Sequence, residues 1–222
     1  MKSLLVLVLI QNLFGFNLVL DIGHTPSKTG AKSFTCEQEY SYNRNLSLYL
    51  LSSLKNINNI NTSLSSEYDR QNITFEERYQ SSIGKNLFLS IHHDSVQEQY
   101  LHFNANGCPS SDHASGFSMF ISRKNPDFLQ SLSYAKKLGQ ALVGEGLHPS
   151  LHHSEKIEGE NRELLDKKLG IYIFDDLKVL KNAKCPAILL EAGVIVNPSD
   201  EELVKSDNFK EKITNAIKKI SE

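Results

Sequence analysis

Leu-Val-Leu-Asp-Ile-Gly-His, residues 18–24, is the stretch that decides the fold, because a short apolar run typical of a buried strand ends there in a glycine and a potential metal ligand, His24. Two later runs repeat this design and end in a second histidine and a glutamate, Phe88–His92 and Ala187–Gly193. In open α/β folds, functional groups gather where the carboxyl ends of neighbouring strands meet. The sequence therefore predicts one polar site at the carboxyl edge of a sheet.

The spacing of apolar residues predicts that strands alternate with helices along the chain. Strands are expected at 18–24, 61–66, 86–92, 116–122 and 187–191, and helices at 39–54, 74–84 and 127–142, with one or two closing helices within 201–220. The polar segments 95–115 and 144–170 are expected to be loops, and 172–180 an apolar connection. This alternation favours a single α/β domain whose mainly parallel or mixed sheet of about five to six strands has helices on both faces.

Length and composition indicate one domain with a full core. The chain has 222 residues, of which 40% are hydrophobic and 23% charged, so it is not expected to be disordered, fibrous or polytopic in a membrane. The formal net charge is -2 and basic blocks are absent, which gives no electrostatic case for a nucleic-acid partner.

The N-terminus resembles a secretory signal. Lys2 precedes an apolar run from Leu4 to Ile10 that is too short to span a bilayer, which takes about 20 apolar residues. We therefore expect residues 1–17 to be a signal peptide and 18–222 the single folded domain, with no transmembrane anchor once the signal is removed. The expected location is periplasmic or secreted. In that oxidising setting, one pair among the three cysteines can close and leave one thiol over: Cys36, Cys108 and Cys185.

Two histidines and a glutamate have the side-chain types of a catalytic zinc site, which commonly takes three protein ligands and leaves a fourth position open. His24 and His92 at strand ends, with Glu39 in the first turn of a helix, can supply those ligands. Glu191 follows four apolar residues, where burying a carboxylate without a partner costs free energy. A carboxylate in this position is suited to act as the general base. Each residue alone also allows a structural role: a hydrogen-bonded histidine, a helix cap or a paired carboxylate.

Six motifs occur in a characteristic order: Asp21-Ile22-Gly23-His24, Glu39 with Asn43, Phe75-Glu76-Glu77-Arg78, Leu89-Ser90-Ile91-His92, Ser115-Gly116, and Leu190-Glu191-Ala192-Gly193 followed by Asn197-Pro198. In this order the chain, from Leu18 to its C-terminus, resembles the zinc-dependent N-acetylmuramoyl-L-alanine amidases of the type 3 family. The resemblance implies one zinc ion held by His24, Glu39 and His92, with Glu191 as the catalytic residue.

The resemblance further implies that peptidoglycan or muropeptides are the substrate, cleaved at the amide between the lactyl group of N-acetylmuramic acid and L-alanine. A protein activator is a possible partner, as for some relatives. The sequence departs from the family at His93, which replaces a small residue. His93, Arg162 and Asn197 are the candidate substrate-binding residues, although a solvated loop equally explains Arg162.

Two other functions remain open at this point. One alternative to the amidase is a catalytically inactive protein of the same fold that binds the cell wall or regulates its turnover. The other is a different zinc amide hydrolase, such as a peptidase or deacetylase. The presence of all four site residues argues against the inactive protein.

Overall fold

The computed structural model describes residues 15–55, 57 and 59–221, so the expected signal lies almost wholly outside the described residues. Seven strands form one sheet in the order β2-β1-β3-β9-β6-β8-β7. The strands are β1 (Phe16–Ile22), β2 (Ile60–Leu64), β3 (Leu87–Asp94), β6 (Ser118–Ile121), β7 (Glu163–Asp166), β8 (Ile171–Ile173) and β9 (Ala187–Val194). The four strands from β2 to β9 are mutually parallel, whereas β6 runs antiparallel to β9. The prediction of a mixed sheet is confirmed, with a strand count slightly above the expected one.

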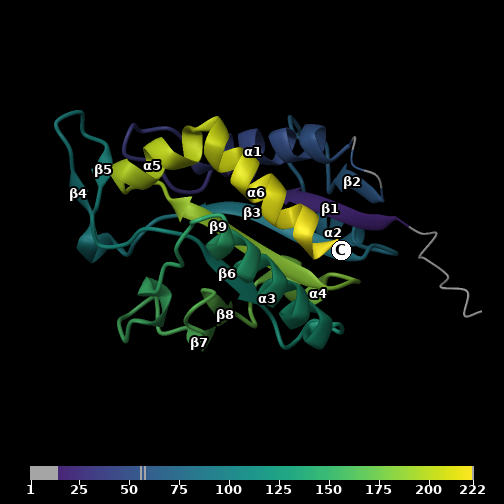
Figure 1. Ribbon diagram of the computed structural model, residues 1–222. Coiled ribbons are helices and arrows are strands. Elements are labelled where there is room, and N and C mark those ends of the chain that lie inside the picture. The colour runs from purple at the N-terminus through teal and green to yellow at the C-terminus, as the bar shows by residue number, and fades with distance from the viewer. Residues whose placement is uncertain (1–14, 56, 58, 222) are drawn as a thin grey trace, which may run out of the picture.

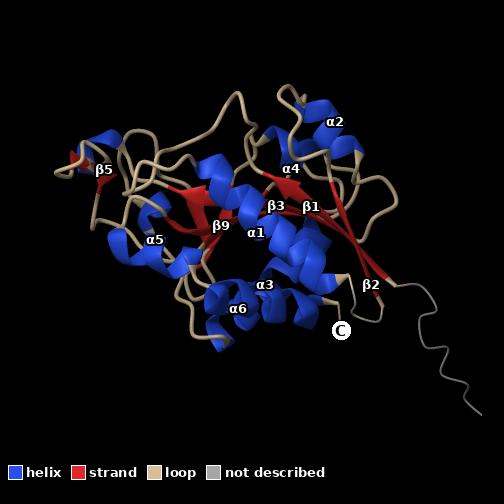
Figure 2. Cartoon of the chain, turned by 90° about the horizontal axis from the view of Figure 1, so that it is seen from above, coloured by secondary structure: helices blue, strands red, loops and turns tan. Residues whose placement is uncertain are grey.

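Helices cover both faces of the sheet, as predicted (Figures 1 and 2). The helices are α1 (Glu39–Leu54), α2 (Phe75–Gln80), α3 (Phe128–Gly144), α4 (Lys178–Asn182), α5 (Pro198–Lys205) and α6 (Asp207–Ile220). Alternation along each strand divides the core. Leu20 and Leu89 pack with α1, α3 and α6 in the larger cluster, whereas Val19 and Phe88 face the smaller cluster beside α4.

Local sequence explains several of these boundaries. Thr74 caps α2 with a full capping box, in which its hydroxyl accepts from the Glu77 N–H and Glu77 accepts from the Thr74 N–H, as predicted. Asn197 caps α5, whose first residue is Pro198. Ser206 then caps α6, so the closing region forms two helices.

Three segments differ from the sequence prediction. The expected loop 144–170 contains η2 (His152–Ser154) and β7, and the expected connection 172–180 contains most of β8 and the start of α4. Both strands are only three or four residues long, which leaves little periodicity for a pattern to detect. The loop 95–115 carries η1 (Glu98–Tyr100) and a small hairpin of β4 (His102–Phe103) and β5 (Pro109–Ser110).

Candidate active site

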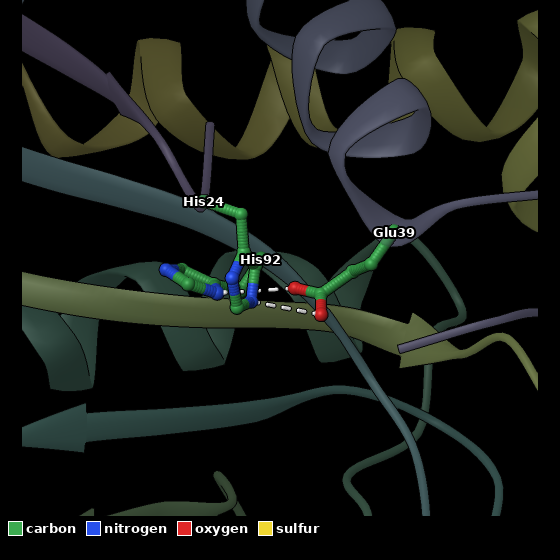
Figure 3. Close-up of side chains that lie close together, drawn as sticks. All are labelled: His24, Glu39 and His92. Carbon is green, nitrogen blue, oxygen red and sulfur yellow. Dashed lines mark hydrogen bonds and ion pairs between the residues drawn. The ribbon is translucent and has the colours of Figure 1, made fainter. Parts of the chain in front are cut away.

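The carboxyl ends of β1 and β3 and the first turn of α1 bring His24, Glu39 and His92 together (Figure 3). The two carboxylate oxygens of Glu39 each face one ring: His24 Nε2 lies 2.9 Å from Oε2, and His92 Nδ1 lies 3.1 Å from Oε1. One ligand atom from each residue lies within 4.8 Å of the other two. The His24–Glu39–His92 cluster is therefore dense enough in donor atoms to hold a metal ion.

Backbone conformation is specialised where these side chains meet. His24 has φ 66°, a left-handed conformation that is uncommon for a residue with a side chain and that frequently occurs at functional sites. A Cβ on Gly23 would lie 2.5 Å from His92 Nε2, and a Cβ on Gly30 would overlap the Glu39 carboxylate. Glycine at both positions is thus needed for the close approach of the three side chains.

Asn43 and His93 hold Glu39 from behind. Asn43, one turn further along α1, donates through Nδ2 to Glu39 Oε1 and to the Gly23 carbonyl, each at 3.1 Å. The backbone N–H of His93 donates to Glu39 Oε1 at 3.3 Å, and His93 Nδ1 lies 2.8 Å from Asn43 Oδ1. With 3% of its surface exposed, His93 lies beneath the cluster and orients it.

Asp21, fully buried on β1 three residues before His24, forms an ion pair with Arg78 of α2. Arg78 donates to both carboxylate oxygens, at 2.8 and 2.5 Å. The hydroxyls of Ser65 and Ser90 donate to the same carboxylate. Burial alone would raise the pKa of Asp21, but Arg78 and the two serines outweigh it and lower that pKa. The pair fixes the end of β1, from which His24 projects.

Glu191 on β9 lies beside His92, because the two residues are register partners in adjacent parallel strands. Its Oε2 is buried and has no hydrogen-bond partner among the described residues. Burial, Asp94 and Glu39 together raise the pKa of Glu191 well above its ordinary value. In contrast, the hydrogen bonds from His24 and His92 outweigh burial and hold the pKa of Glu39 well below its ordinary value. The pKa values of Glu39 and Glu191 are thus shifted in opposite directions, a pattern typical of sites that carry out acid–base chemistry.

Two adjoining cavities open onto this edge of the sheet. One of about 720 Å³ is bounded by His24, α2 and the start of α4, and a second of about 330 Å³ is bounded by Glu191 and Arg162. His92, Leu177 and Leu189 line both, so the site lies on a continuous groove.

The three predicted substrate-binding residues occupy different environments. Arg162 lines the smaller cavity, and its guanidinium carbon lies 3.9 Å from the centre of the Phe174 ring. Asn197 accepts from the N–H groups of α5 and donates to the Ala114 carbonyl, so both ends of its amide are engaged away from the cluster. His93 is buried behind the cluster. Of the three residues, Arg162 is the one that lines the groove.

A disulfide between Cys36 and Cys108 ties the segment before α1 to the β4–β5 hairpin, and Cys185 is buried and free. The structure thus shows which pair closes, a question that the sequence left open. None of the described helices combines the length and apolar character required to cross a membrane.

Together, the mixed α/β sheet, the cluster that could hold a metal ion and the adjacent buried carboxyl group are the features expected of a hydrolase built on an α/β sheet. The family model described as "N-acetylmuramoyl-L-alanine amidase" matches residues 18–220. The chain therefore belongs to the N-acetylmuramoyl-L-alanine amidase family. The resemblance seen in the sequence motifs is thereby confirmed.

Individual relatives agree with the family assignment. The chain is 25% identical over 203 residues to "Probable cell wall amidase LytH" of Staphylococcus epidermidis, covering 91% of this chain and 56% of that protein. It thus spans a little over half the length of that relative. Among solved structures, the amidase Ami1 of Mycobacterium smegmatis superposes with a TM-score of 0.70 at 21% identity, covering 95% of this chain and 96% of that one. The amidase CwlD of Clostridioides difficile, in complex with the GerS lipoprotein, superposes with a TM-score of 0.60 at 20% identity. This match covers 93% of this chain and 96% of that one.

Proposed function

We propose that this chain is a zinc-dependent N-acetylmuramoyl-L-alanine amidase that cleaves the amide between the lactyl group of N-acetylmuramic acid and the L-alanine of the peptidoglycan stem peptide. The observation that carries the proposal is the position of Glu191, a buried carboxyl group with an unpartnered oxygen, beside the His24–Glu39–His92 cluster.

The residues present fit a zinc ion. Two imidazoles and one carboxylate form a common donor set for catalytic zinc. A neutral imidazole is the form that binds a metal, and burial, which outweighs the Glu39 carboxylate, lowers the pKa of His92 and favours that form. Zinc in this position would polarise the scissile carbonyl and lower the pKa of a water molecule. His24, Glu39 and His92 would hold it.

Glu191 supplies the proton transfers. Its raised proton affinity suits a group that takes a proton from the attacking water and then gives that proton to the leaving amine of L-alanine. Because its Oε2 has no partner among the described residues, the carboxyl group is free to bond to substrate or water. Asn43 and His93 keep the ligands in place and do not touch the substrate in this mechanism.

The groove accounts for a long substrate. The larger cavity extends from His24 to α2, and the smaller one from Glu191 to Arg162. A glycan strand and a stem peptide leave the scissile amide in different directions, so two cavities meeting at His92 suit this bond. Arg162 at the far end would pair with a stem-peptide carboxylate through its planar guanidinium.

A peptidoglycan substrate supports a location outside the cytoplasm, in the periplasm or secreted. The Cys36–Cys108 disulfide supports this location, because such bonds persist in oxidising compartments. An activator protein remains a possible partner, and the complex of CwlD with a lipoprotein supports searching for one.

Zinc content and product identity, measured together on wild type and Glu191→Gln, test the proposal. Wild type should release stem peptides with a free L-alanine amino terminus, identified by mass spectrometry, and chelation should abolish the release. Glu191→Gln should keep its zinc and lose about 10²–10⁴-fold in turnover. Glu211→Gln, on the exposed surface of α6, is the matched control and should retain full activity.

The alternatives give different results. Binding to peptidoglycan without any release would identify an inactive wall-binding protein, and cleavage elsewhere would identify a peptidase or deacetylase. Loss of zinc from Glu191→Gln would make Glu191 a ligand instead of the base.

A further inference from the structure

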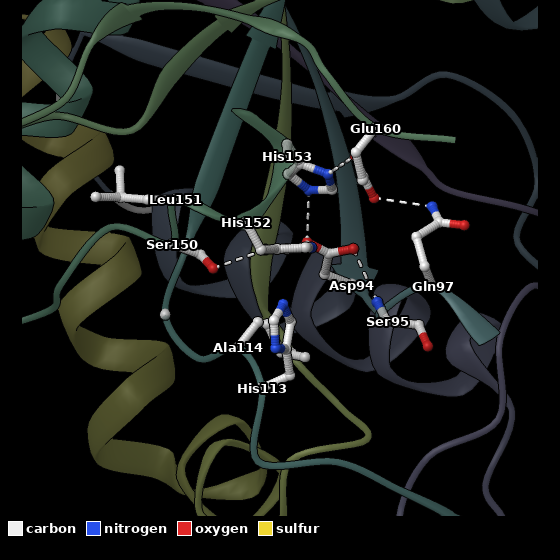
Figure 4. Close-up of polar contacts among 12 residues, drawn as sticks. Asp94, Ser95, Gln97, His113, Ala114, Ser150, Leu151, His152, His153 and Glu160 are labelled. Atoms are coloured by element: carbon white, nitrogen blue, oxygen red, sulfur yellow. Dashed lines mark hydrogen bonds and ion pairs between the residues drawn. The ribbon is translucent and has the colours of Figure 1, made fainter. Parts of the chain in front are cut away.

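A second group of metal-competent side chains lies further along the same groove, separate from the His24–Glu39–His92 cluster (Figure 4). It consists of Asp94 at the end of β3 with His152 and His153 of η2, and is called the Asp94–His152–His153 cluster. The Nε2 atoms of both rings converge on Asp94 Oδ2, at 3.4 Å from His152 and 2.7 Å from His153. One ligand atom of each residue lies within 4.8 Å of the other two.

His152 provides an independent observation that points to a ligand. Only 6% of its surface is exposed, and its Nε2 has no hydrogen-bond partner among the described residues although it points at a carboxylate. Its other nitrogen, Nδ1, lies 2.9 Å from the Ser150 hydroxyl. A buried polar atom without a hydrogen-bond partner lowers the stability of the fold, so a bound ion or other ligand is expected between His152 Nε2 and Asp94.

The outer nitrogen of each ring is also held, as in most metal sites that use histidine. His153 Nδ1 lies 2.9 Å from Glu160 Oε2, and Gln97 donates to the other oxygen of Glu160 at 2.9 Å. Ser150 has the same role for His152, and its backbone carbonyl accepts from the Tyr172 hydroxyl. Such partners fix the ring orientation and leave each Nε2 directed inward.

The position is rigid and can be reached from the groove. The His153 carbonyl accepts from the Arg162 N–H at 2.7 Å, and the Phe120 ring packs edge-on against the His153 imidazole. The smaller cavity, which Glu191 lines, is also lined by Asp94 and His153. An ion can therefore enter from the side on which substrate would bind.

We infer that the Asp94–His152–His153 cluster is a second divalent-cation site, built for a zinc-class ion held by Asp94 Oδ2 and the Nε2 atoms of His152 and His153. Two imidazoles and a carboxylate match the preference of zinc for nitrogen and oxygen donors. The competing state has no ion. In it a protonated His153 bridges Asp94 and Glu160, and His152 Nε2 stays unpartnered. Ion binding at this cluster does not depend on the amidase activity.

Zinc stoichiometry decides between these states. The full chain is saturated with Zn²⁺, freed of loosely held ion by dialysis, and its metal content measured by mass spectrometry. Wild type should hold two zinc ions per chain. His152→Ala and Glu39→Gln should each hold one, and the double variant none. His102→Ala, which removes an exposed histidine of β4, is the matched control and should still hold two.

Anomalous zinc scattering from wild-type crystals gives the same answer without any variant, in case His152→Ala fails to fold. A peak between Asp94 and the two rings supports the inference. One zinc per chain that is unaffected by His152→Ala, or no peak at this position, overturns it. If wild-type crystals show the peak at the Asp94–His152–His153 cluster but none between His24 and His92, the proposed catalytic centre is contradicted and this inference stands.

Discussion

Replacing Asp21 by asparagine should destabilise the protein strongly, because it breaks a buried ion pair from one side. Both carboxylate oxygens accept two hydrogen bonds each, from Arg78, Ser65 and Ser90. The asparagine side chain would present an amide N–H₂ to the Arg78 guanidinium, a donor facing a donor. The guanidinium, which is itself buried, would then carry an uncompensated charge.

Breaking a buried pair from one side typically costs about 3–5 kcal/mol in the free energy of unfolding. For a chain of this length, each kcal/mol corresponds to about 2–4 °C in Tm, so Asp21→Asn should melt about 6–20 °C below wild type. Urea unfolding followed by circular dichroism, with all samples metal-free, measures the free energy directly. Zinc titration of the folded variant should also show weaker binding, since β1 carries His24.

The exposed Arg123–Glu163 pair is the matched control. Its side chains are about half exposed, so Glu163→Gln should change stability by no more than about 1 kcal/mol although it removes the same type of interaction. If Asp21→Asn also costs less than about 1 kcal/mol, the buried pair does not support the end of β1 and the reasoning fails.

The same pair predicts how this contribution varies with pH. The pKa of Asp21 is lowered in the folded state from its ordinary value of 3.8, so the unfolded chain binds the proton more readily. The stabilisation is therefore present above pH 3.8 and is lost as pH falls through the lower, folded-state pKa. The stability difference between wild type and Asp21→Asn should accordingly shrink below pH 3.8 in a series of urea titrations.

Two further predictions concern the approach of the ligands and the disulfide. Gly23→Ala should displace the His92 ring, because the new Cβ would lie 2.5 Å from its Nε2. Calorimetry should then show zinc affinity reduced at least tenfold. Unchanged affinity would mean that the ring can move and still bind zinc. Gly144→Ala, where a Cβ meets nothing within 4 Å, should leave zinc affinity as in wild type. Removing the disulfide by replacing Cys36 and Cys108 with serine opens a loop spanning 72 residues and should cost about 4 kcal/mol in non-reducing urea unfolding. A loss below about 1 kcal/mol would show that the hairpin is held by its other contacts alone.

The sequence predicted the parts of the site that follow directly from strand ends. An apolar run that ends in a histidine or glutamate marks both the strand and the side chain at its carboxyl end, which is why the juxtaposition of His24, His92 and Glu191 was foreseeable. Glu39 was placed by its helix start and by the motif it shares with Asn43. The geometry that brings these residues together agrees with that expectation, and their catalytic roles stay predictions.

The rest depended on tertiary contacts that no local pattern records. Strands β7 and β8 are too short to show alternation, and β7 is half exposed. The polar segment containing His152 and His153 has the composition of a solvated loop, and Asp94, the carboxylate on which both histidines converge, comes from the distant strand β3. Asn197 follows a buried strand and precedes a proline, which equally fits a groove residue or a helix cap. The cap is the role seen in the fold.

Strand β3 explains how one short sequence can serve two clusters. In a strand, successive side chains point to opposite faces, so His92 and Asp94 share a face while His93 faces the other way, toward Asn43 and the Tyr42 ring. The pairing of β3 with β9 shifts register between His92 and Asp94, because β9 advances three residues, from Glu191 to Val194, while β3 advances two. His92 therefore joins Glu39 while Asp94 joins the histidines of η2, and Glu191, the register partner of His92, lines the cavity that Asp94 also lines. A substitution that shifts the backbone at this end of β3 should thus disturb both clusters at once. A substitution confined to η2 should disturb only the Asp94–His152–His153 cluster.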